Sequence, residues 1–375
     1  MMNNTYLSKE NISSSWNPVF VSISIVCYSL IIAFSLLGNS LVCLAICLNK
    51  SLRSSPAMSF IFSLALCDLL TAIFAMPFDA ESLLQNSAWK HSETLCIVWT
   101  TTYLFSVPTS ILTLLVFTID RYKTLSDPLR RFRKSKFLSI RTSRFVVVFL
   151  WCYSLAFCLL PVMGWRRMPH YVVGGYCNFN ITFTYSVVSN ILHFILPLLI
   201  IGGIYFKIYR IAQNVKQCHE LGEGKNSFPG HIARHPSSRD QRHFKRNLRG
   251  TKTIAVIVCA LFICWLPYSV TSTVFGLCKT CFFKSPPEVS VALLMLGYLN
   301  SALNPFIYSL RNWKFKDTYR ILFRSLRKIR RNAQRRSRAS PKTSDSSISG
   351  RHHVSVIGHA SSIRLTSFTV SVSIK

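Results

Sequence analysis

A few ionisable and amide side chains lie inside otherwise apolar stretches of this sequence, and these are the residues whose chemistry would matter most. Asp68 is a lone acid in the middle of one stretch, Asp120 and Arg121 end another, and Asn304 precedes Pro305 in a third. Charged and polar groups are costly at membrane depth, so each position is a candidate for binding or switching. For the Asp-Arg pair, interfacial anchoring is the alternative.

Asp68 needs polar partners, because an unpaired carboxylate in hydrocarbon costs several kcal/mol or becomes protonated. Polar residues occur at comparable depth in other segments, and they are Asn39, Ser110, Asn300, Ser301 and Asn304. Together with Asp68 these side chains predict an oxygen-rich pocket. A water-filled network without a cation is one interpretation of it.

The elements that position these residues are membrane helices. Half of the 375 residues are hydrophobic and the mean hydropathy is positive. About 20 apolar residues cross roughly 30 Å of hydrocarbon. Seven stretches meet that length, near 19–48, 57–84, 94–121, 143–164, 183–209, 251–277 and 288–310. They show no alternating ten-residue pattern, so the sequence predicts an all-α bundle of seven transmembrane helices rather than a barrel.

The positive charges orient the bundle. The net charge is +31, yet only six basic residues fall on the N-terminal side, namely Lys9, Lys90, Arg166, Arg167, Lys279 and Lys284. The remaining 38 lie on the opposite side, which the positive-inside rule assigns to the cytoplasm. Anionic inner-leaflet lipid therefore explains the charge without nucleic acid. We expect a multi-pass plasma-membrane protein with its N-terminus outside.

Three glycosylation sequons lie on the predicted outer side, at Asn3, Asn11 and Asn180. Residues 1–18 are polar and resemble no cleavable signal peptide, so the first span is expected to direct insertion.

Four of the thirteen cysteines fall outside, where oxidation is allowed. Cys96 and Cys177 can tie the second outer loop to the third helix, and Cys278 and Cys281 can close a small ring. Zinc is the alternative for that last pair, although no second Cys or His pair lies beside it.

Four regions follow from these patterns. They are an outer N-terminus at 1–18, the transmembrane domain at 19–311, an amphipathic membrane-surface helix at 312–330 and a disordered cytoplasmic tail at 331–375. The surface helix is predicted from Phe315, Tyr319 and Leu322, which recur at helical spacing opposite basic residues. The tail is rich in Arg, Ser and Thr and is a candidate substrate for kinases, with an inert solvated tail as the alternative.

The sequence resembles the rhodopsin-like, class A, G protein-coupled receptors over about 20–325, because each helix carries a mark of that family. The marks are Gly38-Asn39, Leu64-Ala65-Leu66-Cys67-Asp68, Asp120-Arg121-Tyr122, Trp151, Pro197 with Tyr205, Cys264-Trp265-Leu266-Pro267, and Asn304-Pro305-Phe306-Ile307-Tyr308. The prolines also have a physical role, since each removes a backbone donor and loosens its helix.

The resemblance implies roles for these residues. Activation would free Arg121 to meet a heterotrimeric G protein as the sixth helix swings out, with Tyr205 and Tyr308 closing a water-bridged contact nearby. The coupling and switch set is then Asp120, Arg121, Tyr122, Tyr205, Asn304, Pro305 and Tyr308. A sodium ion is the implied allosteric cofactor, held by Asp68, Ser110, Asn300 and Asn304.

The sequence departs from the family at several points. Lys245-Arg246-Asn247 replaces the acid often found at the base of the sixth helix, which predicts raised basal activity. Leu261 stands one turn before Trp265 in place of the usual Phe, and Pro108 lies inside the third helix.

The resemblance also places a ligand pocket between the outer halves of helices three, five, six and seven, under the second outer loop. The expected lining is Tyr103, Leu104, Val107, Phe179, Ser189, Asn190, His193, Trp265, Tyr268, Ser269, Ser272 and Tyr298. No lysine lies in 288–310 for a retinal Schiff base. Biogenic-amine receptors place an acid, which pairs with the ammonium group, where this sequence has Tyr103. Asp79 or Glu81 is a candidate to replace that acid, and the alternative is that both are solvated charges at the rim.

We therefore expect a receptor, not an enzyme, that activates heterotrimeric G proteins on binding a small amine-like or adenosine-like extracellular ligand. Short peptides and other ligands of class A receptors are the alternative, and a seven-helix transporter is disfavoured because Asp68 is the one deep acid. Other expected partners are membrane lipid, receptor kinase and arrestin.

Overall fold

The computed structural model describes residues 16–126, 138–223, 238–311 and 315–321, together with Arg324, Arg327 and Arg331. The chain divides into two units, Met1–Arg324 and Ser325–Lys375, and the account below concerns the first. Asn3, Asn11, the tail predicted at 331–375 apart from Arg331, and much of the helix predicted at 312–330 lie outside the described residues.

Seven helices within the described residues are long and apolar enough to cross a membrane, which confirms the predicted seven-helix bundle. The first four are formed by α1 (Pro18–Leu48), α3 (Pro56–Phe74) with α4 (Met76–Leu84), α5 (Glu93–Ser126) and α7 (Ile140–Leu159). The last three are formed by α8 (Phe183–Asn190) with η1 (Ile191–Ile195) and α9 (Leu196–Glu223), by α10 (Ser238–Leu277), and by α12 (Pro287–Arg311). The short helices α2 (Lys50–Arg53) and α11 (Lys279–Lys284) lie in connections.

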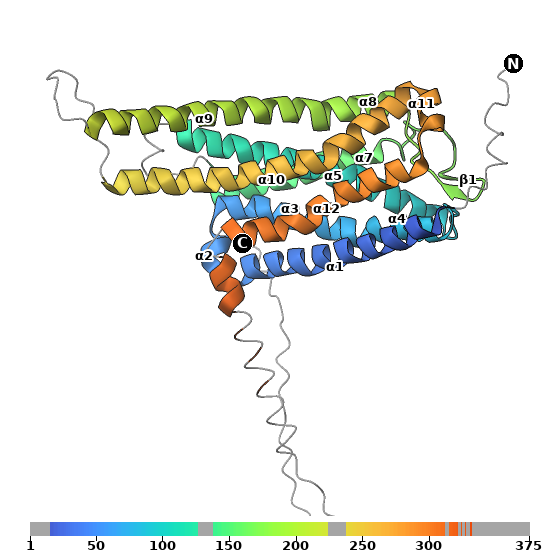
Figure 1. Ribbon diagram of the computed structural model, residues 1–375, viewed down its shortest axis with the longest axis horizontal. Coiled ribbons are helices and arrows are strands. Elements are labelled where there is room, and N and C mark those ends of the chain that lie inside the picture. The colour runs from blue at the N-terminus through green and yellow to red at the C-terminus, as the bar shows by residue number, and fades with distance from the viewer. Residues whose placement is uncertain are drawn as a thin grey trace, which may run out of the picture. The chain divides into compact units, whose positions relative to one another are not determined.

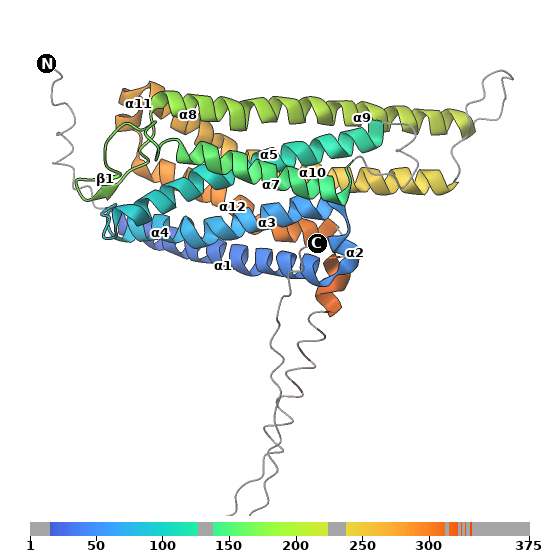
Figure 2. The ribbon, with the colours of Figure 1, turned by 180° about the vertical axis from the view of Figure 1, so that it is seen from behind.

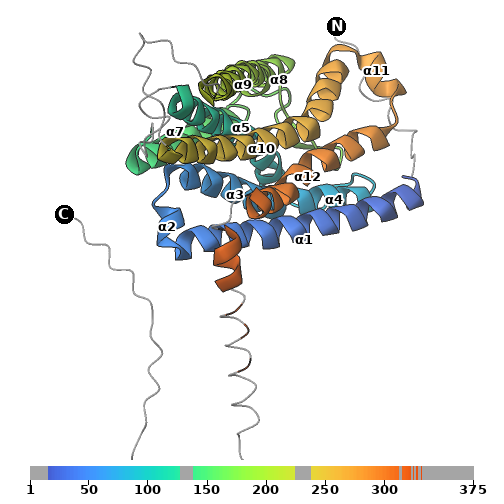
Figure 3. The same ribbon diagram turned by 60° about the vertical axis from the view of Figure 1, so that its left-hand side comes forward.

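The helices pack around α5, which contacts α3, α7, α9 and α10. In Figure 1 and, from behind, in Figure 2, α1, α3 and α12 lie on one side of α5 and α9 lies on the other. Figure 3 shows α12 between α1 and α10. The buried faces of the long helices form a main hydrophobic core that runs from Tyr28 to Phe315, and Leu125 and Ile208 form a smaller cluster beside it.

Two of the spans are interrupted where proline removes a backbone donor. The second span breaks at Ala75, two residues before Pro77, and resumes as α4. The fifth passes through the π-helical turn η1 just before Pro197, and the Leu196 N–H donates to the Ile191 carbonyl across that turn. Such a turn shifts the register of the side chains that precede it.

The end of the bundle that the sequence predicts to be extracellular is closed by a β-hairpin of β1 (Val172–Val173) and β2 (Tyr176–Cys177), which pair antiparallel. Cys177 forms a disulfide with Cys96, near the start of α5, and so holds this loop on the bundle. Cys278 forms a second disulfide with Cys281 at the start of α11. The disulfide predictions are confirmed, and the zinc alternative for Cys278 and Cys281 is excluded because both sulfurs are consumed.

At the opposite end, the helical residues 315–321 pack against the bundle beside α2 (Figure 3). Phe315 is fully buried and stacks on Tyr308 of α12, with ring centroids 6.3 Å apart. The Asn49 side chain, at the end of α1, donates to the Thr318 hydroxyl at 2.8 Å. The predicted amphipathic pattern is therefore present over these residues, since Lys316 and Arg320 are exposed.

Candidate ligand cavity and coupling site

A cavity of about 230 Å³ lies in the half of the bundle that carries the β-hairpin, between α5, α8, η1 and α10, and Phe179 and Ile181 of the loop after the hairpin also line it. Its wall contains eleven of the twelve residues predicted from the sequence. They are Tyr103, Leu104, Val107, Phe179, Ser189, Asn190, His193, Trp265, Tyr268, Ser269 and Ser272. A concave, mostly apolar space with a few polar groups is the usual form of a small-molecule site.

One wall of the cavity is aromatic and centres on Tyr103. Its ring meets Phe179 at 5.3 Å, Trp265 at 5.8 Å and Tyr268 at 6.1 Å between centroids, each edge to face or nearly so. These arrangements suit the ring quadrupoles and fix the four side chains against one another. This wall offers flat apolar surface and phenol groups to a ligand.

The opposite wall carries uncharged hydrogen-bonding groups from α8 and α10. Ser269 donates to the Asn190 carbonyl oxygen at 2.7 Å, and the Asn190 amide donates to Thr273 at 2.6 Å. Asn190 therefore bridges the fifth and sixth spans directly beside the cavity. A ligand that hydrogen-bonds Asn190 would compete with this bridge.

His193 lines the cavity, but both of its ring nitrogens already have partners. Nε2 lies 3.0 Å from the Tyr153 hydroxyl and Nδ1 lies 3.3 Å from the Ser189 hydroxyl. The ring is 3% exposed and meets Phe157 edge to face at 4.5 Å. His193 is therefore a packed polar residue that holds the fourth and fifth spans together.

The structure differs from the prediction at Tyr298, which does not line the cavity. Its side chain is 1% exposed, and its hydroxyl donates to Asp79 at 2.6 Å on the far side of Trp265. Sequence reasoning missed six lining residues, namely Pro108, Ile111, Ile181, Tyr185, Ser186 and Phe194. Helical spacing could have found several of them, since Pro108 and Ile111 follow Leu104 and Val107 by one turn and Tyr185 and Ser186 precede Ser189 by one.

The roof of the cavity depends on Asn180, a predicted glycosylation site that is 1% exposed. Its oxygen accepts from the backbone N–H groups of Arg167 and Met168, at 3.1 and 2.8 Å. Its nitrogen donates to the carbonyls of Met168 and His170, at 2.7 and 3.1 Å. The folded loop therefore leaves Asn180 no room for a glycan, which corrects the sequence prediction, and places Phe179 and Ile181 over the cavity.

The same loop is held to α5 by Glu93, whose carboxylate accepts from the Tyr171 N–H at 2.6 Å. The Tyr171 side chain is 2% exposed and packs beneath the hairpin. Burial raises the pKa of its phenol, which stays neutral at any physiological pH.

Replacing Asn180 with alanine should loosen the roof of the cavity. Four backbone groups would lose their partner, and a buried unsatisfied group costs about 1–3 kcal/mol. We expect a lower Tm for the purified receptor, no change in its response to glycosidase, and loss of all glycan in the Asn3→Gln/Asn11→Gln variant. A glycosidase-dependent mobility shift that disappears only when Asn180 is replaced would contradict this assignment.

Asp68 lies between the second and seventh spans and is 4% exposed. Ser301 donates to its Oδ1 at 2.7 Å, and Asn304 donates to its Oδ2 at 2.9 Å. Ser301 and Asn304 were both predicted for the oxygen-rich pocket, and they are the direct partners of Asp68. The sodium set implied by the resemblance named Asp68, Ser110, Asn300 and Asn304. The side-chain oxygens of Asn39, Asn300 and Asn304 are buried without a hydrogen-bond partner.

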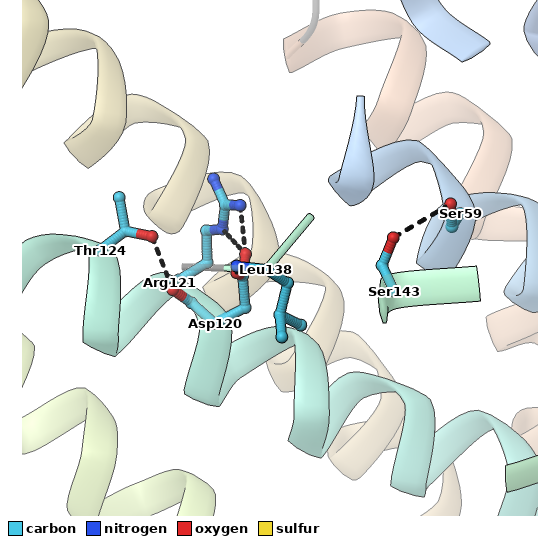
Figure 4. A network of polar contacts seen from close by, with 6 residues as sticks. All are labelled: Ser59, Asp120, Arg121, Thr124, Leu138 and Ser143. Atoms are coloured by element: carbon cyan, nitrogen blue, oxygen red, sulfur yellow. Dashed lines mark hydrogen bonds and ion pairs between the residues drawn. The ribbon is translucent and has the colours of Figure 1, made fainter. Parts of the chain in front are cut away.

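Near the C-terminal end of α5, Asp120 and Arg121 form the predicted pair (Figure 4). Asp120 is fully buried and accepts from the Arg121 Nε at 3.0 Å and from the Leu138 backbone N–H at 3.3 Å. The Arg121 guanidinium also lies over the Phe117 ring, 5.5 Å from its centroid. Asp120 thus holds Arg121 and the start of the α7 segment in one place.

The other switch residues surround this pair. Tyr122 packs against Leu125 and Ile208. The hydroxyls of Tyr205 and Tyr308 are both buried, and that of Tyr308 has no hydrogen-bond partner among the described residues. Pro305 is buried in α12. The side chains of Lys245-Arg246-Asn247 lie outside the described part of the molecule, so the basal activity expected from them stays a prediction.

Comparison with known proteins agrees with this arrangement. Residues 38–308 match the 7 transmembrane receptor (rhodopsin family), so the chain belongs to that family of receptors, and it is not an enzyme. A D(5)-like dopamine receptor of Takifugu rubripes is 32% identical over 292 residues, which span 74% of this chain and 62% of that receptor.

Two further relatives align over more of their length. The histamine H2 receptor of Canis lupus familiaris is 31% identical over 85% of this chain and 84% of its own. The 5-hydroxytryptamine receptor 4 of Homo sapiens is 29% identical over 78% of this chain and 77% of its own. The chain is thus a multi-pass membrane receptor similar to receptors for small amines.

Proposed function

We propose that this chain is a plasma-membrane receptor, with its N-terminus outside, that binds a small extracellular amine and activates a heterotrimeric G protein. The proposal rests mainly on the observation that α5 and the sixth span lead from the ligand cavity toward the coupling site. Tyr103 of α5 and Trp265 of α10 wall the cavity, and Asp120 and Arg121 lie at the other end of α5. The names of the relatives support an amine as ligand.

A second ligand class is favoured by the cavity wall itself. No acid lines the cavity among the described residues, and Ser189, Asn190, Ser269 and Ser272 offer uncharged donors and acceptors. An uncharged molecule of the nucleoside type would suit such a wall. A ligand screen of this receptor should therefore test nucleosides and short peptides as well as dopamine, histamine and 5-hydroxytryptamine.

The pocket around Asp68 is the proposed site of a sodium ion that stabilises the resting receptor. Its donors are oxygens, as a hard cation requires, and three amide oxygens nearby are buried without a partner. Asp68, Ser301 and Asn304 are in direct contact, and Asn300 and Ser110 complete the proposed set. A bound cation there would neutralise the carboxylate.

The remaining partners are proposed from the sequence. A Ser/Thr-rich tail becomes a docking segment for arrestin once a receptor kinase adds phosphates. The basic cytoplasmic surface and the helix at 315–321 suit anionic lipid, since Lys316 and Arg320 point outward.

Replacing Arg121 with alanine should abolish the second-messenger response to any active compound of the screen. The proposal makes Arg121 the group that meets the G protein, so its removal breaks coupling while the cavity, at the opposite end of α5, still binds ligand. Second-messenger output and ligand binding are measured in cells with equal surface expression. Arg210, an exposed residue of α9, provides the control substitution Arg210→Ala.

An Arg121→Ala variant that signals as strongly as the wild type would overturn the coupling mechanism. If no compound of the screen changes output or thermal stability of the wild type, the proposed ligand class is wrong.

A further inference from the structure

The structure contains a second acid inside the extracellular half of the bundle, Asp79 of α4, which has no cationic partner. Its side chain is half-buried, and one carboxylate oxygen accepts from the Tyr298 hydroxyl at 2.6 Å. In the part of the chain that the structure describes, no Lys, Arg or His nitrogen lies within ion-pair distance of it. A carboxylate taken partly out of water without a counter-charge is costly, and a bound cation offsets that cost.

The other acid at this end, Glu81, is different. It is bound by His91 at 2.9 Å and by Gln85 at 2.5 Å, and it lies at the rim, where its side chain is 34% exposed. Its carboxylate already has partners and faces solvent. Glu81 is therefore a rim residue, and Asp79 is the acid that faces inward.

Aromatic side chains surround Asp79. Tyr298 meets Tyr28 with centroids 6.3 Å apart and Trp265 at 6.0 Å. The Trp99 indole N–H faces the Asp79 carboxylate, and the Trp99 ring is 7% exposed. A carboxylate enclosed by Tyr and Trp rings is the arrangement that binds an organic ammonium group, through charge and through the ring faces.

Asp79 and the aromatic rings around it are separated from the cavity by one residue. Tyr298, which binds Asp79, contacts Trp265 of the cavity wall. Trp99, on the other side of Asp79, contacts Phe179 of the same wall at 5.5 Å. Tyr103 packs on both Phe179 and Trp265, and it therefore contacts the two cavity-wall rings that adjoin the group around Asp79.

We propose that Asp79 is the counter-ion of an amine ligand, with the ammonium held between the Asp79 carboxylate and the rings of Tyr103, Trp99 and Tyr298. The ligand is then an arylalkylamine that spans both walls. Its cationic end reaches past Tyr103 toward the second and seventh spans, and its polar ring substituents face Asn190 and Ser269. This inference rests on the proposed function, because it takes an amine as the ligand.

The test compares Asp79→Asn with the matched rim variant Glu81→Gln. Asparagine keeps the volume and the acceptor for Tyr298, so the change removes charge with little loss of packing. Each receptor is assayed with dopamine, histamine and 5-hydroxytryptamine, and with the arylalkanols in which a hydroxyl replaces the ammonium. Removing one partner of a desolvated charge pair should weaken the active amine by about 30-fold or more.

The expected result is that Asp79→Asn loses potency for the amine but not for its arylalkanol, and that Glu81→Gln changes neither. The double variant Asp79→Asn/Tyr103→Asp provides a gain of function, because it returns a carboxylate to the same group of rings and should restore the amine response. It also keeps the test decisive if Asp79→Asn reaches the surface poorly.

Two outcomes would overturn the inference and are distinguishable from failure of the proposed function. Equal amine potency in the wild type and in Asp79→Asn excludes Asp79 as the counter-ion while leaving an amine receptor intact. Equal loss of potency for the amine and for the arylalkanol shows that Asp79 only supports the fold. If neither the wild type nor the Asp79→Asn/Tyr103→Asp double variant responds to any amine, the proposed amine ligand itself is wrong.

Discussion

Replacing Cys177 with serine should remove most of the receptor from the cell surface, whereas replacing Cys281 should leave it almost unchanged. The Cys96–Cys177 disulfide joins residues 81 positions apart, and the Cys278–Cys281 disulfide joins residues 3 apart. Chain entropy alone gives about 4.5 kcal/mol for a loop of about 80 residues and less than half of that for a loop of about 3. Inserted helices already restrict the chain, so the larger part of the loss should come from the roof of the cavity.

Surface expression and ligand binding are measured for Cys96→Ser, Cys177→Ser and the double variant. All three variants should lose the same amount of surface expression and ligand binding, because each of them removes the same disulfide. The effects of replacing the two partners of one bond are not additive. Cys278→Ser and Cys281→Ser are the internal controls. An effect of Cys281→Ser as large as that of Cys177→Ser would show that loop length does not decide the contribution of these disulfides.

Replacing Gly38 with alanine should destabilise the bundle, although it adds a single methyl group. That methyl group would lie 2.7 Å from the Pro305 Cγ and 2.9 Å from its Cβ, which is closer than carbon atoms approach. Pro305 is a rigid ring inside α12, so α1 must move away from α12. Overpacking of this kind costs about 1–3 kcal/mol.

The matched control is Gly203→Ala in α9, where an added methyl group meets nothing within 4 Å. In a helix interior, alanine is favoured over glycine by roughly 0.5–1 kcal/mol, so this change should be neutral or stabilising. The Tm of the purified receptors should therefore fall for Gly38→Ala and not for Gly203→Ala. Equal Tm values would show that α1 can shift without cost.

The seven spans could be predicted from the sequence, because the length of an apolar stretch determines whether it can cross the membrane. The local interruptions within these spans could not be predicted. Pro77 and Pro197 are visible in the sequence, yet whether a proline breaks a helix, as at Ala75, or produces a π-helical turn, as at Ile191–Ile195, depends on the packing of neighbouring spans. The fourth helix ends at Leu159, short of the predicted residue 164, since Pro161 and the positive φ of Gly164 begin the outer loop.

The cavity could be predicted where the resemblance to rhodopsin-like receptors carried lining positions over to this sequence, as for Tyr103, Leu104 and Val107. Asn180 and Tyr298 show why the rest could not. The sequon at Asn180 is a local pattern, but its burial results from hydrogen bonds to a loop 10 to 13 residues away. Tyr298 faces Asp79 because of a contact across 219 residues, which no local signal reveals.

The orphan hydroxyl of Tyr308 bears on how easily this receptor changes state. A buried polar group without a partner costs about 1–3 kcal/mol, so a conformation that gives this hydroxyl a partner recovers about that much. Reversing a two-state population from 1:99 to 99:1 takes about 5.5 kcal/mol of differential affinity. Satisfying Tyr308 in an alternative conformation would therefore supply part of that free energy, and the ligand would have to supply only the rest.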